Sequence, residues 1–363
     1  MHPARRARGV LPLLTLLLAS CATGIPAPEQ TLQPPPAGAW RREDLAPGVE
    51  LLEFQGPRTR ITGSASYLTG SGGSLGFGIT VPAGRSDLPR ISAAALIVDL
   101  RQAELLPVAE LAPPGAAAAG SAPAPGPAAL EAGGRDKPRG GDARGEVLAI
   151  RPSLLLEERG ELLAGINATF FEPNVMSVGR RVDPLGLVIL EGRLVSEANP
   201  GYAALYWLAD GTLRIAGQSG PGAPSSGGGE SPAEGAGAYR EAGVTDALGG
   251  YFVVLSAGVA TGPVRLRAAR SALGLSADRR TAILLAVAGE APGSSVGLTA
   301  REVGAWLASL GAEEGLLLDG GGSSSLAVRE AASGAVRMTI EPSWGPARGV
   351  ERPVATVLAV RGR

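Results

Sequence analysis

The chain has 363 residues, a length that fits one compact enzyme domain with extensions or about two domains. Hydrophobic residues make up 45% of it, enough for a sizeable core, and the formal charge of -1 gives no electrostatic reason to expect a nucleic-acid partner. The only histidine is His2 and the only cysteine is Cys21. The rest of the chain therefore excludes a Ser-His-Asp triad, a cysteine nucleophile, a zinc site of the His/Cys kind and disulfide bonds.

Residues 1–20 are predicted to be a lipoprotein signal peptide. Three arginines, the last of them Arg8, precede an apolar run from Val10 to Leu18, which is the order typical of a secretory signal. The run is too short for a transmembrane helix, which needs about 20 residues. It closes on Leu18-Ala19-Ser20-Cys21, which resembles a bacterial lipobox, so Cys21 is the predicted lipidation site. We therefore expect a lipid-anchored membrane protein of the bacterial cell envelope, facing the periplasm or the exterior. An ordinary signal peptide with a chance cysteine is the alternative.

Residues 21–48 are predicted to be a flexible tether, because they are rich in proline and alanine and contain the cluster Pro34-Pro35-Pro36. The remainder, 49–363, is predicted to form a single domain. Two low-complexity tracts of Pro, Ala, Gly and Ser interrupt it, at 111–145 and 218–237. Such composition cannot build a core, so both tracts are expected to be flexible insertions.

Short apolar runs separated by turns predict a mostly antiparallel sheet. In chain order, strands are expected at 91–100, 147–150, 162–166, 185–190, 203–208, 212–215, 248–260, 281–288, 315–318 and 354–360. Turns at Gly192-Arg193 and Asp210-Gly211 fit hairpin connections. The clearest helix begins after Thr299, with Glu302 completing a capping box, and closes at Gly311. The expected fold class is α+β, a mixed, largely antiparallel sheet with few helices.

Asp319 stands at the end of the short apolar strand 315–318 and begins an unusual loop. It is followed by Gly320-Gly321-Gly322-Ser323-Ser324-Ser325. Glycines let a backbone approach a ligand closely, and successive amides can converge into an anion-binding nest. Asp319 itself could act as general acid or base, as nucleophile, or as ligand of a hard cation. The alternative is a Gly/Ser-rich turn in which Asp319 makes an Asx-turn.

Six short motifs, read together, resemble the phosphodiester glycosidase family over roughly residues 91–360. They are, in chain order, Ile166-Asn167-Ala168-Thr169-Phe170-Phe171, Pro184-Leu185-Gly186 with Gly192, Arg270-Ser271-Ala272-Leu273-Gly274, Gly297-Leu298-Thr299, Leu318-Asp319-Gly320-Gly321-Gly322-Ser323-Ser324 and Glu351-Arg352-Pro353-Val354. The chain departs from the family pattern in having Ala168-Thr169 in place of Gly-Gly and Ser271 in place of threonine. The resemblance implies an enzyme that hydrolyses a glycosyl phosphodiester.

The resemblance also implies which residues line the site. Asp319, Arg270 and Asn167 are the expected catalytic residues, and the expected substrate-binding residues are Gly320, Gly321, Ser323 and Arg352. An arginine suits a phosphodiester because its guanidinium binds two phosphate oxygens in a fork. Arg270 is the first choice for that contact and Arg352 the second. The alternatives are a solvated surface arginine at 270 and a structural ion pair at 352.

Several questions stay open from the sequence. Glu172 and Asp183 are the candidates for a second catalytic carboxylate, and the pair Phe170 and Phe171 is expected in the core rather than as a platform for a sugar. No cofactor and no metal are expected, although a divalent cation held by Asp319 stays open. The expected partners are a glycosyl-phosphate or polysaccharide substrate and the membrane. The alternative function is that of a non-catalytic envelope lipoprotein that binds sugar-phosphate polymers.

Overall fold

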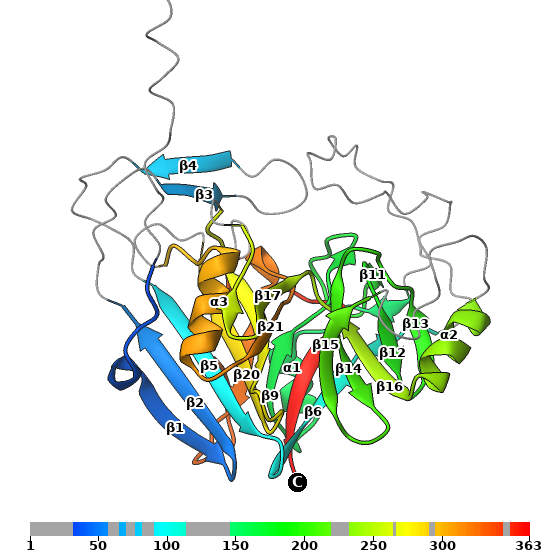
Figure 1. The fold of residues 1–363 in the computed structure, drawn as a ribbon. Coiled ribbons are helices and arrows are strands. Elements are labelled where there is room, and N and C mark those ends of the chain that lie inside the picture. The colour runs from blue at the N-terminus through cyan, green and yellow to red at the C-terminus, as the bar shows by residue number, and fades with distance from the viewer. Residues whose placement is uncertain are drawn as a thin grey trace, which may run out of the picture.

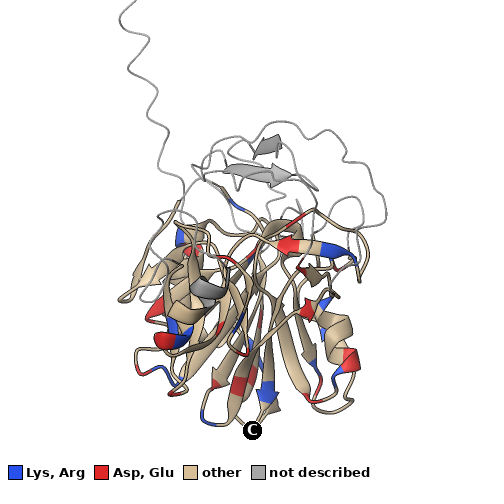
Figure 2. Ribbon diagram, turned by 90° about the vertical axis from the view of Figure 1, so that its right-hand side faces the viewer, with Lys and Arg blue, Asp and Glu red and all other residues tan. Residues whose placement is uncertain are grey.

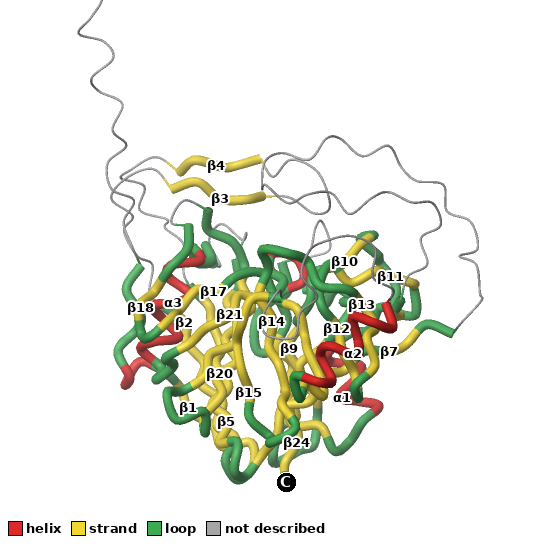
Figure 3. The backbone as a smooth tube through the Cα atoms, turned by 45° about the vertical axis from the view of Figure 1, so that its right-hand side comes forward, coloured by secondary structure: helices red, strands yellow, loops and turns green. Residues whose placement is uncertain are grey.

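Antiparallel strands are the main secondary structure of the protein, whose computed structural model describes residues 32–56, 65–69, 77–81, 91–113, 146–218, 232–263, 266–289, 295–343 and 349–363. All strand pairings within these ranges are antiparallel, and the described strands form five sheets. The described part also contains three α-helices, which pack against the outside of the strand assembly (Figures 1 and 3). The predicted α+β class with a largely antiparallel sheet is confirmed.

The largest sheet has eight strands. Their order across the sheet is β1 (Arg41–Ala46), β2 (Val49–Gln55), β5 (Ser92–Asp99), β20 (Thr281–Val287), β19 (Arg270–Leu275), β21 (Glu314–Leu317), β17 (Val253–Ser256) and β18 (Val259–Ala260). The central strands β5, β20 and β19 are buried almost along their whole length. That burial explains their continuous apolar runs, since a strand covered on both faces has no polar side.

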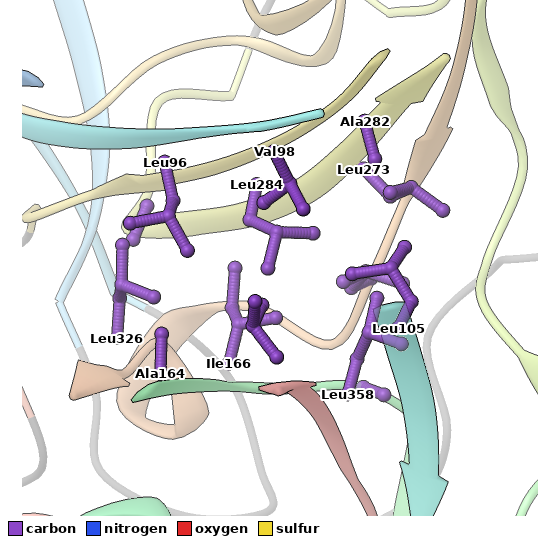
Figure 4. Close-up of a cluster of buried hydrophobic side chains, with 14 of the residues drawn as sticks. Leu96, Val98, Leu105, Ala164, Ile166, Leu273, Ala282, Leu284, Leu326 and Leu358 are labelled. Atoms are coloured by element: carbon purple, nitrogen blue, oxygen red, sulfur yellow. The ribbon is translucent and has the colours of Figure 1, made fainter. Parts of the chain in front are cut away.

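A five-stranded sheet faces the first one. It consists of β23 (Val336–Met338), β22 (Leu326–Arg329), β9 (Leu162–Asn167), β24 (Val357–Gly362) and β6 (Ala103–Val108), in that order. Figure 4 shows the core between the two sheets, where Leu96 and Leu284 on one side approach Ile166 and Leu358 on the other. The two sheets thus form a sandwich whose inner faces carry the main hydrophobic core.

Three smaller sheets complete the described strands. One has the order β13 (Arg193–Ser196), β12 (Val188–Leu190), β16 (Val244–Gly249), β14 (Ala203–Leu208) and β15 (Leu213–Gly217). Another has the order β10 (Phe171–Glu172), β11 (Arg181–Pro184), β8 (Val147–Leu148) and β7 (Glu110–Leu111), and the last pairs β3 (Ala65–Thr69) with β4 (Phe77–Val81). The hairpin of β12 and β13 turns through Glu191 and Gly192, both at positive φ, one residue earlier than the expected Gly192-Arg193. The hairpin at Asp210-Gly211 is confirmed.

The helices are α1 (Pro152–Glu158), α2 (Pro232–Glu241) and α3 (Ala300–Ser309), with short 3-10 turns η1 (Ala37–Ala39) and η2 (Gly321–Ser323). The predicted capping box at the start of α3 is confirmed, because the Thr299 side chain accepts from the Glu302 N–H and the Glu302 carboxylate accepts from the Thr299 N–H. Buried Glu302 also pairs with Arg267 at 2.6 Å. No helix in the described ranges is long and apolar enough to cross a membrane.

The expected tether 21–48 ends earlier than its composition indicates. Its last part forms strand β1, and Trp40 is only 6% exposed, packed against Phe54 and Trp306. The polar residues of β1 do not show the pattern of a buried strand, because β1 is an edge strand whose charged side chains form ion pairs, as Arg42 does with Glu50 at 2.9 Å. Residues 21–31 of the expected tether and the signal peptide lie outside the described residues.

Helices and strands also extend into the ends of the two low-complexity tracts, which were expected to be flexible. Residues 114–145 and 219–231 lie outside the described residues, but the flanks of both tracts are structured. Glu110–Leu111 forms strand β7, and Pro232–Glu241 forms helix α2. Gln218 is fully buried, and its side-chain oxygen accepts from the Leu187 and Asn199 N–H groups. The strand expected at 248–260 is divided, because β16 belongs to a different sheet from β17 and β18.

Candidate active site

The expected site residues come from strands of both facing sheets. Asn167 ends β9, Arg270 begins β19, Asp319 follows β21, and Arg352 precedes β24. Two backbone hydrogen bonds join these segments, from the Leu318 N–H to the Ser271 carbonyl at 2.9 Å and from the Asp319 N–H to the Ala168 carbonyl at 2.8 Å. The structure therefore brings together motifs that are far apart in the sequence.

Asn167 holds the frame of the site. Its Nδ2 donates to the Asp319 backbone carbonyl at 2.6 Å, and its Oδ1 accepts from the Ser271 hydroxyl at 2.6 Å and from the Ser325 N–H at 3.0 Å. The side chain is fully buried. Both ends of the amide are thus engaged with the protein, and one of these bonds holds the backbone of Asp319. The expected catalytic role of Asn167 stays a prediction.

Asp319 is the ionisable group at the centre of this arrangement. Its side chain is buried, and burial raises the pKa of its carboxyl to about 6. Three neighbours work in the opposite direction and favour the carboxylate, namely hydrogen bonds from the Ser323 hydroxyl and the Gly320 N–H and the positive charge of Arg352. Asp319 therefore changes its protonation state near pH 6, within the range that acid-base catalysis uses.

Arg352 lies beside Asp319 and is fixed from two directions. Its Nη1 donates to the Ser323 hydroxyl oxygen at 3.0 Å, its Nη2 donates to Asn174 Oδ1, and its guanidinium carbon lies 4.7 Å from the centre of the Phe171 ring. Burial lowers the pKa of Arg352, and the charge of Asp319 opposes that shift. Ser323 thus links the cation to the carboxylate, and buried Phe171 supports the guanidinium from one face.

Arg270 reaches the site from the other side of the loop. Its Nε donates to the Leu298 carbonyl and its Nη2 to the Leu266 carbonyl, each at 3.1 Å. A Cβ placed on Gly320 would lie 3.8 Å from Arg270 Nη1 and only 3.0 Å from the Ala269 carbonyl oxygen. Gly320 is therefore packed between this arginine and the β19 segment, where a side chain has little room.

The glycine loop does not form the expected anion-binding nest. The Gly320 N–H donates to the Asp319 carboxylate, and the Gly321 N–H donates to the Ala269 carbonyl at 2.9 Å. The Ser323 N–H donates to the Gly320 carbonyl at 3.2 Å, which closes the 3-10 turn η2. These amides are used to build the turn that presents Ser323 to Asp319, so they are not available to an anion.

Three buried polar atoms near Asp319 have no hydrogen-bond partner among the described residues. They are Thr169 Oγ1, Ser324 Oγ and Arg352 Nε. The pairing of β22 with β9 matches Leu326 with Ile166, so in the same register Ser324 lies across from the Ala168-Thr169 segment. Because buried polar groups are nearly always paired, these three atoms are available to a polar ligand. Thr169, a departure from the family pattern, thus adds a hydroxyl to this cluster.

Glu351 is a buried carboxylate that was not among the expected site residues. It accepts from the Ser153 N–H, at 3.3 Å to Oε2, and from the hydroxyls of Ser153 and Ser325. Burial raises the pKa of Glu351, against the hydrogen bonds from Ser153 and Ser325. Ser325 connects Glu351 to Asn167, because its hydroxyl donates to Glu351 and its N–H donates to Asn167. Arg352 is held by Ser323 and Asn174, so an ion pair with Glu351 is not what fixes it. The only sequence signal for Glu351 was its place in the motif with Arg352.

The two acidic residues expected as candidates for a second catalytic carboxylate lie on the neighbouring strands β10 and β11. Glu172 of β10 is opposite Asp183 of β11 in the strand register, and it follows Phe171 directly. Glu172 is exposed, and Asp183 is half-buried. In the described part of the chain, no group of three or more His, Cys, Asp or Glu side chains is placed to hold a metal ion.

Two solved structures share this fold. The chain matches the catalytic domain of zebrafish N-acetylglucosamine-1-phosphodiester alpha-N-acetylglucosaminidase, auto-inhibited by its pro-peptide, with 18% identity and a TM-score of 0.51 over 88% of this chain and 85% of that one. It matches a putative exported protein from Burkholderia pseudomallei with 16% identity and a TM-score of 0.53 over 93% of this chain and 99% of that one. No curated protein sequence matches it.

The sequence itself gives the family. The model of the phosphodiester glycosidase domain matches residues 160–361, which is more than half of the chain and includes Asn167, Arg270, Asp319 and Arg352. The matched range also contains the strands β9, β19, β21 and β24 that carry these residues. The chain therefore belongs to the phosphodiester glycosidase family.

Proposed function

We propose that this chain hydrolyses a glycosyl phosphodiester, with Asp319 as the catalytic carboxylate. The observation that carries the proposal is the trio Asp319, Ser323 and Arg352, in which a buried carboxyl with a pKa of about 6 is linked through one hydroxyl to a guanidinium. The substrate of such an enzyme carries one permanent negative charge on its phosphate. Arg352 and Arg270 supply positive charge on either side of the Asp319 loop, where that phosphate would bind.

The same trio suggests which form of Asp319 reacts. Burial raises the pKa of Asp319, but Ser323, Arg352 and Gly320 all favour its carboxylate over the carboxylic acid. We therefore assign the carboxylate the role of nucleophile toward the sugar carbon, or of the base that takes a proton from the water that attacks this carbon. The leaving group would be a phosphate monoester, whose second pKa is about 6. Such a group leaves without strong help from an acid, especially beside an arginine. A second carboxylate at Glu172 or Asp183 is therefore not required for departure of the leaving group.

The alternative is a non-catalytic protein that binds sugar-phosphate polymers in the same place. The buried, unpartnered hydroxyls of Thr169 and Ser324 are consistent with it, because they provide binding groups without reactivity. One experiment separates the two functions. Purified protein is incubated with a panel of glycosyl phosphodiesters in water enriched in oxygen-18, and the products are identified by mass. Labelled free sugar supports the proposed cleavage at the sugar carbon, labelled phosphate indicates cleavage at phosphorus, and binding without products supports the alternative.

The cell-envelope setting is a further part of the proposal and rests on residues 1–24, which lie outside the described residues. If Cys21 is lipidated, Cys21→Ser should abolish metabolic labelling with a fatty acid and leave the protein extractable without detergent, because several acyl chains are what hold such a protein in a membrane. Ser20→Ala, next to it, serves as the matched control and should keep the label. Unchanged labelling of Cys21→Ser would remove the lipoprotein hypothesis.

A further inference from the structure

An aromatic cluster lies beside the site, in a chain whose residues are only 4% aromatic. The chain has five phenylalanines and five tyrosines, and two of each meet here. The Phe170 and Tyr251 ring centres are 5.3 Å apart, those of Tyr202 and Tyr251 are 4.9 Å apart, and those of Tyr251 and Phe252 are 4.5 Å apart. We call Phe170, Tyr202 and Tyr251 the aromatic shelf. Phe252 anchors it, since this ring packs with the core beneath α3.

The shelf is only partly buried. All three of its residues are of intermediate exposure, and Phe170 and Tyr202 belong to none of the four hydrophobic clusters of the described chain. The expectation that Phe170 and Phe171 both lie in the core is therefore wrong for Phe170 and confirmed for Phe171. Tyr251 packs against the core beneath α3, as Phe252 does, and Phe170 and Tyr202 extend from it outside the core clusters.

The tyrosines of the shelf differ from two other tyrosines nearby. The hydroxyls of Tyr206 and Tyr239 are used internally, donating to the carbonyls of Gly217 at 3.0 Å and Gln218 at 3.2 Å. Within the described ranges, the hydroxyls of Tyr202 and Tyr251 donate to no protein group. A half-exposed tyrosine with its hydroxyl available presents an apolar ring face and a polar edge to the same ligand.

The backbone places the shelf next to Asp319 on two sides. The Tyr251 N–H donates at 2.7 Å to the carbonyl of Leu317, two residues before Asp319. Phe170 comes two residues after Ala168, whose carbonyl accepts from the Asp319 N–H at 2.8 Å. Two residues of extended chain span about 7 Å. The backbone of Phe170 and that of Tyr251 therefore lie close to the backbone of Asp319.

We propose that the aromatic shelf is the subsite that binds the pyranose ring of the substrate, with the C–H face of the sugar on the rings and its hydroxyls at the tyrosine edges. This inference rests on the proposed function and names the part of the protein that recognises the sugar. The arginines hold the phosphate, and the shelf fixes the sugar so that its anomeric carbon lies toward Asp319. Of the apolar or amphipathic ligands a shelf of this kind could take, a pyranose is the one that continuity with Asp319 and the two half-exposed tyrosines favour.

The test separates sugar binding from catalysis. Binding of neutral methyl pyranosides, in the gluco, manno, galacto and N-acetylglucosamine forms, is measured by saturation-transfer NMR and titration, with dimethyl phosphate as a probe for the charge alone. We expect at least one pyranoside to bind the wild-type protein. Tyr202→Ala and Phe170→Leu should each weaken that binding by about tenfold or more, as removal of a ring from a central contact does. Tyr202→Phe should keep most of it.

Controls distinguish the shelf from general damage to the fold. Tyr206→Phe changes a tyrosine on the same chain segment whose hydroxyl is internal, and it should bind pyranosides as the wild type does. Dimethyl phosphate should bind Tyr202→Ala and the wild type equally. Thermal unfolding shows whether each variant is folded, and Phe170→Leu serves if Tyr202→Ala is not.

Two results would overturn the inference, namely no pyranoside bound by the wild type, or pyranosides bound equally by the wild type and by folded Tyr202→Ala and Phe170→Leu. These results are separable from failure of the proposed function. If no diester is hydrolysed yet pyranoside binding depends on the shelf, hydrolysis fails and the shelf stands. If diesters are hydrolysed with unchanged KM in the shelf variants, hydrolysis stands and the shelf fails.

Discussion

Asp319→Asn is expected to lower kcat for a glycosyl phosphodiester by at least about 100-fold while leaving substrate binding largely intact. The substitution keeps the shape of the side chain and an oxygen that can accept from Ser323, but it removes the charge and the nucleophile. The measurement is a steady-state assay of sugar release, paired with a binding titration of the same diester. Glu172→Gln, a carboxyl-to-amide change on neighbouring β10, is the matched comparison and should have a much smaller effect on kcat.

The same variant should become more stable relative to the wild type as pH rises from 4 to above neutral. Burial raises the pKa of Asp319 from 3.8 to about 6 in the folded protein, so the wild type loses stability as pH rises from 3.8 through 6, where the folded state must release a proton it holds more tightly than the unfolded chain does. Asparagine does not titrate. The free energy of unfolding of Asp319→Asn relative to wild type should therefore rise by about 2 to 3 kcal/mol between pH 4 and pH 7.5.

Urea unfolding of both proteins at the two pH values measures this difference. A difference that stays constant with pH would mean that Asp319 has an ordinary pKa and is solvated, which contradicts the buried geometry. A full loss of kcat together with the expected gain in stability would show that the folded protein holds a destabilised carboxyl at its site, as enzymes do when activity requires it.

The central strands and the helix α3 were predictable because their signals are local. The runs at 281–288 and 91–100 are continuous and apolar, as strands buried on both faces are, and Thr299 with Glu302 is a complete capping box. The break between β16 and β17 was not visible in the apolar run 248–260. It depends on Gly250, where a Cβ would lie 2.7 Å from the Leu317 carbonyl oxygen, a contact with a strand far away in the sequence.

The proximity of Asp319 and Arg352 was also predictable, but the hydrogen bonds around them were not. Asp319 and Arg352 meet as the motifs imply, whereas Asn167 is occupied by hydrogen bonds to Ser271, Ser325 and the Asp319 carbonyl. The hydrogen-bond partners of the Asn167 amide depend on the pairing of β9 with β22 and on the loop after β21. Neither can be predicted from the residues next to Asn167 in the sequence. Glu351 was overlooked for the same reason, because its partner Ser153 lies 198 residues earlier.

Arg352→Met should reduce kcat/KM by about 10- to 100-fold, since a hydrogen bond to a charged group contributes about 1.5 to 3 kcal/mol. It should also move the pH dependence. The charge of Arg352 lowers the pKa of Asp319, so its removal raises that pKa further above 6. If the carboxylate is the reactive form, activity of the wild type falls below pH 6, and in Arg352→Met this fall should begin at higher pH.

Two further variants test whether the shift of the pH profile comes from the positive charge at position 352. Arg352→Lys keeps a positive charge but cannot bridge Ser323 and Asn174, so it should lose part of kcat/KM while its pH profile stays near that of the wild type. Arg270→Met should raise KM without moving the profile, because the guanidinium of Arg270 is bonded to the Leu298 and Leu266 carbonyls and is not among the groups that shift the pKa of Asp319. An unchanged profile in Arg352→Met would separate the charge of Arg352 from the ionisation of Asp319, and Arg352 would then act on the phosphate alone.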